Sequence, residues 1–150
     1  MRISAVLMSL AGAATLAAVI CPAVVQAKEC YAPDARSQER AFSRAVSTEG
    51  GKIIWLGGQT GQPTADFDGQ VRQIFDELDK TIKANGGSGV KDMTTMTVFI
   101  TDVRLGDRLT QIRKEIFKDC FPASALITVT ALARPGMLIE IQGMAVVGGK

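Results

Sequence analysis

The amino-acid sequence predicts an α+β domain with one mixed sheet and two helices packed on one face of that sheet. Two segments place apolar residues three and four positions apart, which is the pattern of amphipathic helices. Around them, short runs either alternate apolar and polar residues or are continuously apolar, as strands do. The expected order of elements is β-β-α-β-α-β-β. Because the two helices cover one face, the other face must meet solvent or another subunit.

The first segment, Met1–Ala27, has the layout of a secretory signal peptide. Arg2 is followed by an apolar run, then by Pro22 and by small residues at Val25 and Ala27, the two positions that matter for cleavage. We therefore expect cleavage after Ala27 and a periplasmic or secreted mature chain. The alternative is an uncleaved membrane anchor, since the run is long enough to span a bilayer. Its many alanines and glycines favour the signal peptide.

The mature chain is expected to begin with a polar arm, residues 28–41, followed by the domain at residues 42–150. Phe42–Val46 has the composition of a short strand. Lys52–Leu56 is compact, apolar and rich in β-branched and aromatic residues, which predicts a buried strand. The glycine turn between them predicts a hairpin. Gly57–Gln62 is expected to leave the strand as a loop.

The remaining elements follow from the same two periodicities. The first helix has a complete apolar stripe, an acidic residue (Asp66 or Asp68) to cap its start and an Asn-Gly-Gly sequence to end it. In chain order we expect a helix at Asp68–Ala84, a strand at Met93–Thr101, a helix at Leu105–Lys118, and strands at Ser124–Ala131 and Met137–Val147.

The composition excludes several kinds of catalytic site. The 150 residues contain no histidine, so there is no Ser-His-Asp triad, Cys-His dyad, histidine base or histidine metal ligand. The two cysteines after the signal segment, Cys30 and Cys120, do not make a metal site. They could pair in an oxidising compartment or stay free thiols, and the sequence leaves both open. A net charge of +2 gives no case for nucleic acid or an anionic membrane as a partner.

Glu140 is the unusual acidic residue, because it interrupts the apolar run Met137–Gln142. By strand alternation it shares a face with Leu138 and Gln142. It is either paired or functional, or it lies at an edge or rim where a charge blocks aggregation. The glycines at 57–61 lack the spacing of a dinucleotide or phosphate loop. They read as a tight turn that could present backbone N–H groups to a ligand.

Three segments occur in an order and at a spacing that resemble a known family. They are Thr97–Asp102 (TVFITD), Phe121–Ser124 (FPAS) and Ile139–Val146 (IEIQGMAV). Together with the element order, they resemble the Rid family of reactive-intermediate deaminases, also called YjgF-type proteins or endoribonuclease L-PSP. The resemblance covers residues 42–147 and implies a chorismate-mutase-like fold. It also implies a homotrimer around a central barrel, with small-molecule pockets in the three clefts between subunits.

The resemblance further implies hydrolysis of imine and enamine acids to 2-oxo acids and ammonia, as in a 2-iminobutanoate/2-iminopropanoate deaminase, without cofactor or metal. The family's glutamate, which handles the water, matches Glu140. Ser124 stands where the family's Pro-Ala-Arg-Ser segment has the arginine that clamps the substrate carboxylate. Leu126 stands where many members have cysteine. The family's tyrosine, serine and asparagine match Phe42, Gly57 and Thr110, so the expected cleft residues are Phe42, Arg44, Gly57, Gly58, Thr110, Ser124 and Leu126, with Arg44 included because it shares a strand face with Phe42.

Serine is too short to replace a guanidinium. We therefore expect an exported Rid-type protein that binds a small molecule, with the deaminase activity lost or altered. One alternative is a cofactor-free hydrolase that uses Glu140 and water. A second alternative, a ribonuclease or translation inhibitor, is disfavoured by the near-neutral charge and the export signal.

Overall fold

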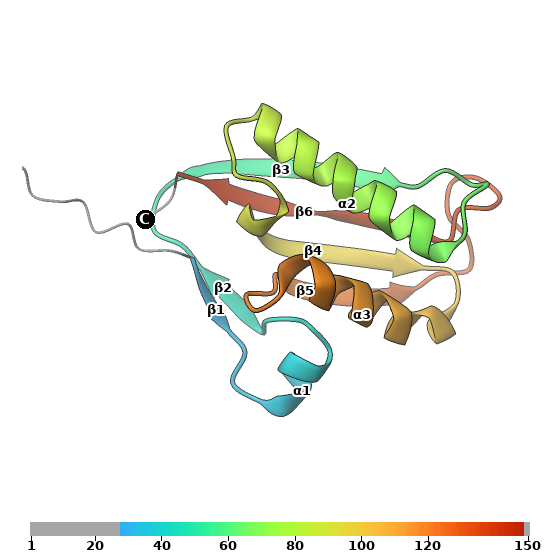
Figure 1. The fold of residues 1–150 in the computed structure, drawn as a ribbon, viewed down its shortest axis with the longest axis horizontal. Coiled ribbons are helices and arrows are strands. Elements are labelled where there is room, and N and C mark those ends of the chain that lie inside the picture. Colours follow the sequence, from blue (N-terminus) through green and yellow to red (C-terminus); the bar gives the residue numbers. More distant parts are fainter. Residues whose placement is uncertain (1–27, 149–150) are drawn as a thin grey trace, which may run out of the picture.

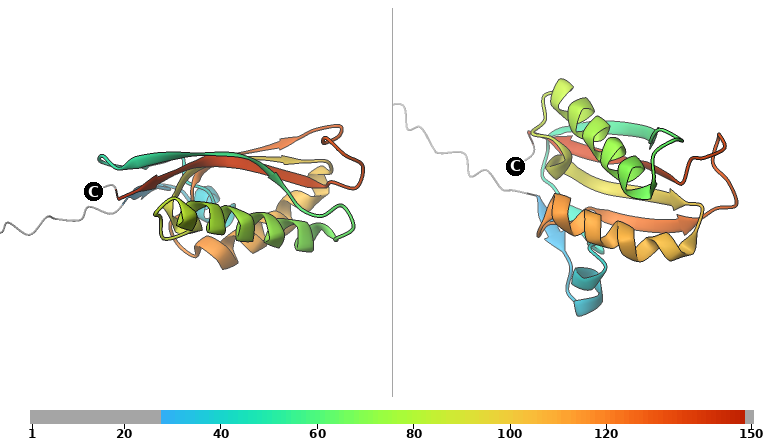
Figure 2. Two further views of the ribbon diagram at one scale, coloured as in Figure 1. Left: turned by 90° about the horizontal axis from the view of Figure 1, so that it is seen from above. Right: turned by 45° about the vertical axis from the view of Figure 1, so that its right-hand side comes forward.

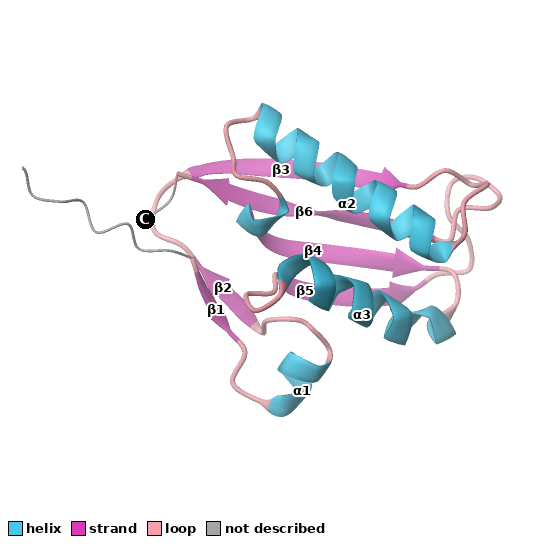
Figure 3. Cartoon of the chain, viewed as in Figure 1, coloured by secondary structure: helices cyan, strands magenta, loops and turns pink. Residues whose placement is uncertain are grey.

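The computed structural model describes residues 28–148 and contains a four-stranded sheet covered on one face by two helices (Figures 1 and 3). The strand order is β3-β6-β4-β5, and β6 runs antiparallel to both neighbours while β4 and β5 are parallel. The bounds are β3 Lys52–Thr60, β4 Met93–Ile100, β5 Ala123–Thr128 and β6 Ile139–Val147. The predicted α+β class with a mixed sheet is therefore confirmed.

Both long helices, α2 (Phe67–Ala84) and α3 (Gly106–Phe117), lie on the same face of the sheet (Figure 2). Asp66 caps α2 by accepting a hydrogen bond from the N–H of Gly69 at 2.8 Å. The rings of Phe75 and Phe117 meet edge to face at 5.6 Å and join the two helices. The predicted apolar stripe of α2 is buried in full, and it consists of Val71, Ile74, Phe75, Leu78 and Ile82.

The opposite side of the sheet carries no helix, and we call it the uncovered face (Figure 2). It is formed by the side chains of β3, β4, β5 and β6 that alternate with the buried ones. Ile54 and Leu56 of β3 are buried toward the helices, whereas Ile53 and Trp55 are 54% and 77% exposed. Large apolar side chains thus lie open on a face that the sequence predicted to be without a helix.

Residues 28–47 contain more structure than the expected polar arm. β1 (Glu29–Tyr31) pairs antiparallel with β2 (Ala45–Ser47), and α1 (Ala35–Glu39) lies between them in the chain. Cys30 and Cys120 form a disulfide, with 5.6 Å between their Cα atoms. This disulfide ties β1 to the segment that leads into β5. Of the two possibilities that the sequence left open for the cysteines, the structure contains the pair.

Two predictions about this region are wrong. The expected hairpin of residues 42–46 with 52–56 does not form, because β2 pairs with β1 and β3 pairs with β6. Gly50 and Gly51 both have positive φ, and through them the chain leaves one sheet for the other. The loop expected at Gly57–Gln62 is strand as far as Thr60, with a register shift between Leu56 and Gln59. The ladder with β6 continues past Gly57 and Gly58, although consecutive glycines usually indicate a loop.

The other elements match their predictions to within a few residues. Short 3-10 turns precede β4 at Val90–Asp92 and α3 at Val103–Leu105, and the predicted strands Ser124–Ala131 and Met137–Val147 are shorter than expected. Among residues 28–148, no helix has the length and apolar character needed to cross a bilayer. The signal peptide predicted at Met1–Ala27 lies outside the described residues.

Candidate functional site

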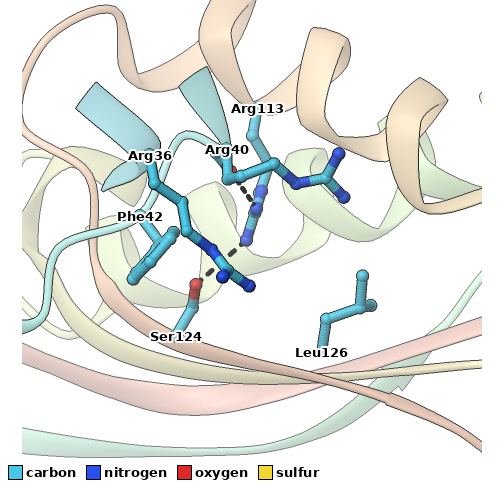
Figure 4. Close-up of a pocket in the computed structure, with 6 residues that line it drawn as sticks. All are labelled: Arg36, Arg40, Phe42, Arg113, Ser124 and Leu126. Carbon is cyan, nitrogen blue, oxygen red and sulfur yellow. Dashed lines mark hydrogen bonds between the residues drawn. The ribbon is translucent and has the colours of Figure 1, made fainter. Parts of the chain in front are cut away.

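A cavity of about 290 Å³ opens between α1, α3 and β5, and three arginines contribute to its wall (Figure 4). We call it the arginine cavity. Phe42 and Leu126 supply apolar walls, and Ser124 lies between them on the strand side. The complete lining is Arg36, Arg40, Phe42, Arg113, Ser124 and Leu126. Three of the expected cleft residues, Phe42, Ser124 and Leu126, are therefore together here.

Arg113 of α3 is the most deeply buried of the three arginines, with 4% of the residue exposed. Its Nη1 donates a hydrogen bond to Oγ of Ser124 at 3.0 Å, and its Nη2 donates to the carbonyl oxygen of Arg40 at 2.6 Å. Its Nε–H is buried and has no hydrogen-bond partner in the described part of the chain. Burial, together with the nearby charge of Arg40, lowers the pKa of Arg113 to about 10. The guanidinium therefore remains charged at neutral pH.

The positive charge in the arginine cavity is only partly neutralised. Arg40 forms an ion pair with Asp107. No acidic side chain between residues 28 and 148 pairs with Arg36 or Arg113. In Figure 4 the guanidinium groups of Arg36 and Arg113 both extend toward Ser124, whereas that of Arg40 points away. The wall beside Ser124 thus suits a small anion.

The short helix α1 holds two of these arginines in place. Asp34 caps it, accepting hydrogen bonds from the N–H of Ser37 at 2.8 Å and from the Ser37 hydroxyl at 2.7 Å. The bonds from Ser37, with those from Arg44, lower the pKa of Asp34 to about 2. Arg44 donates to Asp34 through Nε at 2.8 Å and Nη2 at 2.6 Å. Arg44 does not line the arginine cavity and instead fixes the cap of the helix beside it.

Glu140 lies elsewhere, near the start of β6 and opposite Thr60 and Phe99 in the sheet register. A Cβ atom at Gly58 would lie 2.0 Å from Oε1 of Glu140, so the glycine leaves the space that the carboxylate occupies. The residue is half-buried, and no hydrogen bond or ion pair to its carboxylate is found within residues 28–148. Because β6 is an inner strand, the edge-strand explanation of this charge does not apply.

The expected site residues fall on two sides of the sheet. Ser124 and Leu126 are in register with the buried residues Met96 and Val98, so they face the helices. Glu140 is in register with Phe99, which alternates with these buried residues, so it belongs to the uncovered face. Within one chain, the acidic residue and the arginine cavity are therefore separated by the sheet.

Two further expected residues lie outside both groups. Thr110 is buried and donates its hydroxyl to the carbonyl oxygen of Gly106 at 3.0 Å, within its own helix. It does not line the arginine cavity. Gly57 is exposed, and a Cβ atom there would have no heavy atom within 4 Å. Gly57 therefore leaves open space where Gly58 makes a close approach.

The sequence analysis missed Arg36, Arg40 and Arg113. A signal existed for Arg113, which stands four residues after Leu109 and four before Phe117, on the buried stripe of α3. A charged residue at an apolar position of a helix is unusual unless it has a partner. No signal marked Arg36 or Arg40, because their position depends on the fold of a segment expected to be an arm. The described residues contain no cluster of three or more candidate metal ligands.

Comparison with known proteins points to one family across nearly all of the domain. A family model described as endoribonuclease L-PSP matches residues 32–147. The chain is 32% identical over 114 residues to Protein DfrA of Myxococcus xanthus, covering 70% of this chain and 84% of the relative. It is 27% identical over 113 residues to the human 2-iminobutanoate/2-iminopropanoate deaminase, covering 71% of this chain and 80% of that protein.

Solved structures agree on the fold. A Yersinia pestis protein of unknown function from the conserved Rid protein family, YyfB, superposes with a TM-score of 0.70. The match covers 80% of this chain and 98% of that protein, at 21% sequence identity. At this identity the likeness shows the fold alone, which is the chorismate-mutase-like fold that the sequence led us to expect.

Proposed function

The chain belongs to the Rid family, and we propose that it is an exported member that binds a small molecule in clefts between the subunits of a homotrimer. One observation carries this proposal: Glu140 lies on the uncovered face, whereas Ser124 lies on the face that the helices cover. One chain cannot present both groups to one ligand. A neighbouring copy seated on the uncovered face could bring its arginine cavity to the Glu140 side of the sheet.

The composition of the uncovered face supports this assembly. Trp55 and Ile53 are 77% and 54% exposed, and Ile127 is also exposed on this face. Large apolar side chains gathered on one face are typical of a surface that another protein covers. A rotational arrangement of identical subunits would cover the same face on every copy and leave none open.

We propose that the deaminase chemistry is altered, because the carboxylate clamp at position 124 is absent. The human relative is named as a deaminase of 2-iminobutanoate and 2-iminopropanoate, which are small carboxylates. A charge-assisted hydrogen bond contributes about 1.5–3 kcal/mol. Loss of a two-bond clamp at Ser124 would therefore slow turnover of such a substrate by a factor of roughly 10²–10⁴.

A second candidate is a cofactor-free hydrolase, and the unpaired carboxylate of Glu140 favours it. Glu140 would take a proton from water as the water oxygen bonds to the carbon of the protonated imine, C=NH₂⁺, which gives a neutral carbinolamine. Glu140 would then give that proton to the nitrogen, and ammonia would leave as the C–N bond breaks. The carboxylate of Glu140 would accept the hydroxyl proton as the 2-oxo group forms. The imine and water enter, and the 2-oxo acid and ammonia leave.

An ammonia-release assay on 2-iminopropanoate generated in situ tests the proposal. We expect a rate at least about 100-fold below that of an arginine-bearing family member under the same conditions. Glu140→Gln should abolish any release above background. Turnover equal to the arginine-bearing member would contradict the altered activity. A single-subunit mass in native mass spectrometry would contradict the homotrimer.

We further propose that the protein is exported. The Cys30–Cys120 disulfide supports it, because such bonds form and persist in oxidising compartments. The intact mass of protein recovered from the periplasm or medium should correspond to a chain that starts at Lys28. Recovery only in the cytoplasm, with Met1 retained, would contradict export.

A further inference from the structure

Unfavourable features of the structure gather at one junction, where residues 28–47 meet the end of α3 and the start of β5. We call these residues the N-terminal unit. Within the described part of the chain, Ala41 and Lys118 are the only non-glycine residues with positive φ. The only buried side-chain polar atoms there without a hydrogen-bond partner are Oγ of Ser43 and Nε of Arg113. Backbone strain persists only where the surrounding structure enforces it, so this junction needs a restraint.

The two strained residues each follow a helix that borders the arginine cavity. Lys118, directly after α3, has φ 66° and ψ −70°. The N–H of Asp119 donates to the carbonyl oxygen of Phe117 at 2.9 Å, which completes a γ-turn of the strained, positive-φ kind. Ala41 follows the last turn of α1 with φ 54° and is fully buried. Both helices therefore end in a conformation that a residue with a Cβ atom disfavours.

Noncovalent contacts hold the N-terminal unit weakly. The unit projects from one side of the molecule, next to α3 and β5 (Figure 1). Ala41 is its only residue in the hydrophobic core, so burial contributes little more than one methyl group. The N–H of Ser43 donates to the carbonyl oxygen of Pro122 at 3.2 Å, and Nζ of Lys28 donates to that of Met93 at 2.8 Å. The ion pair between Arg40 and Asp107 is exposed and stabilises little.

We propose that the Cys30–Cys120 disulfide is a redox switch that restrains the strained turn at Lys118, and that its reduction releases the N-terminal unit and opens the arginine cavity while the main sheet stays folded. The inference rests on the proposed small-molecule function and names how that site is regulated. Cys120 stands two residues after Lys118, and Cys30 lies in β1. The disulfide therefore joins the strained turn directly to the unit that it holds.

Opening the switch is a thiol–disulfide exchange with a dithiol. A thiolate of the dithiol attacks one cysteine sulfur, forms a mixed disulfide and releases the other cysteine as a thiolate, which takes up a proton. The second sulfur of the dithiol then closes its own disulfide and releases the remaining cysteine as a thiol. The protein gains two electrons and two protons, and the dithiol loses them. Both cysteines are half-buried and outside the hydrophobic core, which favours access by a small dithiol.

The switch links the small-molecule site to export. In a reducing compartment the two thiols stay free, so α1 is not held over the cavity. In an oxidising compartment the disulfide forms and fixes α1 against α3 and β5. The cavity is thereby completed only after the chain has left the cytoplasm.

Limited trypsin digestion with mass spectrometry tests the switch, because Arg36, Arg40 and Arg44 are cleavage sites within the N-terminal unit. Protein is reduced with dithiothreitol, alkylated and freed of both reagents before digestion, and oxidised protein receives the alkylating reagent alone. Reduction should speed cleavage in the N-terminal unit at least about 10-fold, because local opening exposes these bonds. Cleavage after Arg72 and Lys80 of α2 should change by less than about 2-fold, since the main domain stays folded.

Lys118→Gly tests the strained turn, and Lys118→Ala is its matched control. Both variants lose the lysine side chain, but only glycine adopts this positive φ without a steric cost. After reduction and alkylation, the N-terminal unit of Lys118→Gly should be cut about 10-fold more slowly than that of Lys118→Ala, because the glycine turn has no strain to release. The oxidised forms should be cut equally slowly, since the disulfide holds the unit in both.

Three outcomes would overturn the proposal. Equal cleavage of the N-terminal unit before and after reduction would show that noncovalent contacts suffice to hold it. An equal rise at the α2 sites would show that reduction unfolds the whole domain. Equal rates for the reduced glycine and alanine variants would show that the turn at Lys118 drives no opening. Failure of the proposed function would appear separately, as a single-subunit mass in solution or full deaminase turnover.

Discussion

The arginine cavity and the uncovered face differ in the charge that they carry. The cavity holds arginines and the uncovered face holds Glu140, and the reaction expected of the family uses both kinds of group. The arginine cavity lies between α1, α3 and β5, and two of its three arginines, Arg36 and Arg113, have no acidic partner within residues 28–148. The uncovered face is open and apolar, and it holds Glu140 without a cation among the described residues. Each half contains charge that the fold of one chain leaves unpaired. A group left unpaired in one chain is a group available to a ligand or a second subunit.

The two regions also differ in what holds them together. The arginine cavity depends on residues that precede the main sheet, namely α1 with its Asp34 cap and the Cys30–Cys120 disulfide. The uncovered face depends on the central ladder of β3, β6 and β4. Changes can therefore be chosen that affect one region and spare the other, and the following three do so.

The largest effect is expected from Cys30→Ser combined with Cys120→Ser. The disulfide joins residues 90 positions apart, and the chain-entropy estimate for such a loop is about 4 kcal/mol of folding free energy. Urea unfolding should show this loss, because β1 is no longer covalently tied to the segment that leads into β5. The mass of the proposed homotrimer should stay unchanged, since the uncovered face is intact.

The control for this prediction is a reductant. Reductant should destabilise the wild type to the level of the double variant and should leave the double variant unaffected. Equal stability of wild type and double variant without reductant would show that the disulfide does not support the arginine cavity.

The second effect concerns the uncovered face. Trp55→Glu should dissociate the proposed homotrimer, because burial of this tryptophan by a neighbouring subunit would be worth about 2–3 kcal/mol and a buried carboxylate would oppose association further. Sedimentation velocity would show the fall in mass, while the folding of the single chain and its disulfide should persist. Val103→Glu is the matched control, since Val103 is 72% exposed and lies in the turn before α3, outside the uncovered face. The same mass for both variants would place the interface elsewhere.

The helices and most strands were predictable because their signals are local. Val71, Ile74 and Leu78 lie on one face of a helix whatever else the chain does, and Asp66 caps that helix through residues three positions away. The partner of β2 was not predictable in this way. By sequence distance, either β1 or β3 could pair with β2. The pairing with β1 depends on the ladder between β3 and β6 and on the Cys30–Cys120 bond.

The candidate site was predictable only where one residue type marks it. Glu140 is conspicuous as a charge in an apolar strand, and the serine at 124 is conspicuous against the family's motif. The meeting of Arg113 with Ser124 joins a helix to a strand, and the presence of Arg36 depends on a helix in a segment that composition marks as an arm. Such contacts join residues that are far apart in the sequence. They depend on tertiary structure, which periodicity and spacing do not predict.

The smallest effect is expected from a single methyl group at Gly58. This change tests whether hydrolysis depends on the position of the Glu140 carboxylate. In Gly58→Ala the new Cβ would lie 2.0 Å from Oε1 of Glu140, so the carboxylate must turn away. The atom that moves is the end of a flexible side chain, so stability should change by less than about 1 kcal/mol. The ¹³Cδ signal of Glu140 should shift, and residual ammonia release should fall about 10-fold, as expected when a general base is misplaced.

Gly57→Ala is the matched control, because a Cβ atom there has no heavy atom within 4 Å. It should leave both the ¹³Cδ signal of Glu140 and the ammonia release unchanged. If both alanine variants shift the signal equally, the space at Gly58 does not determine where the carboxylate lies. If only Gly58→Ala shifts it and ammonia release is unaffected, Glu140 takes no part in hydrolysis. The chemistry of this chain would then be binding alone, with the arginine cavity as its functional half.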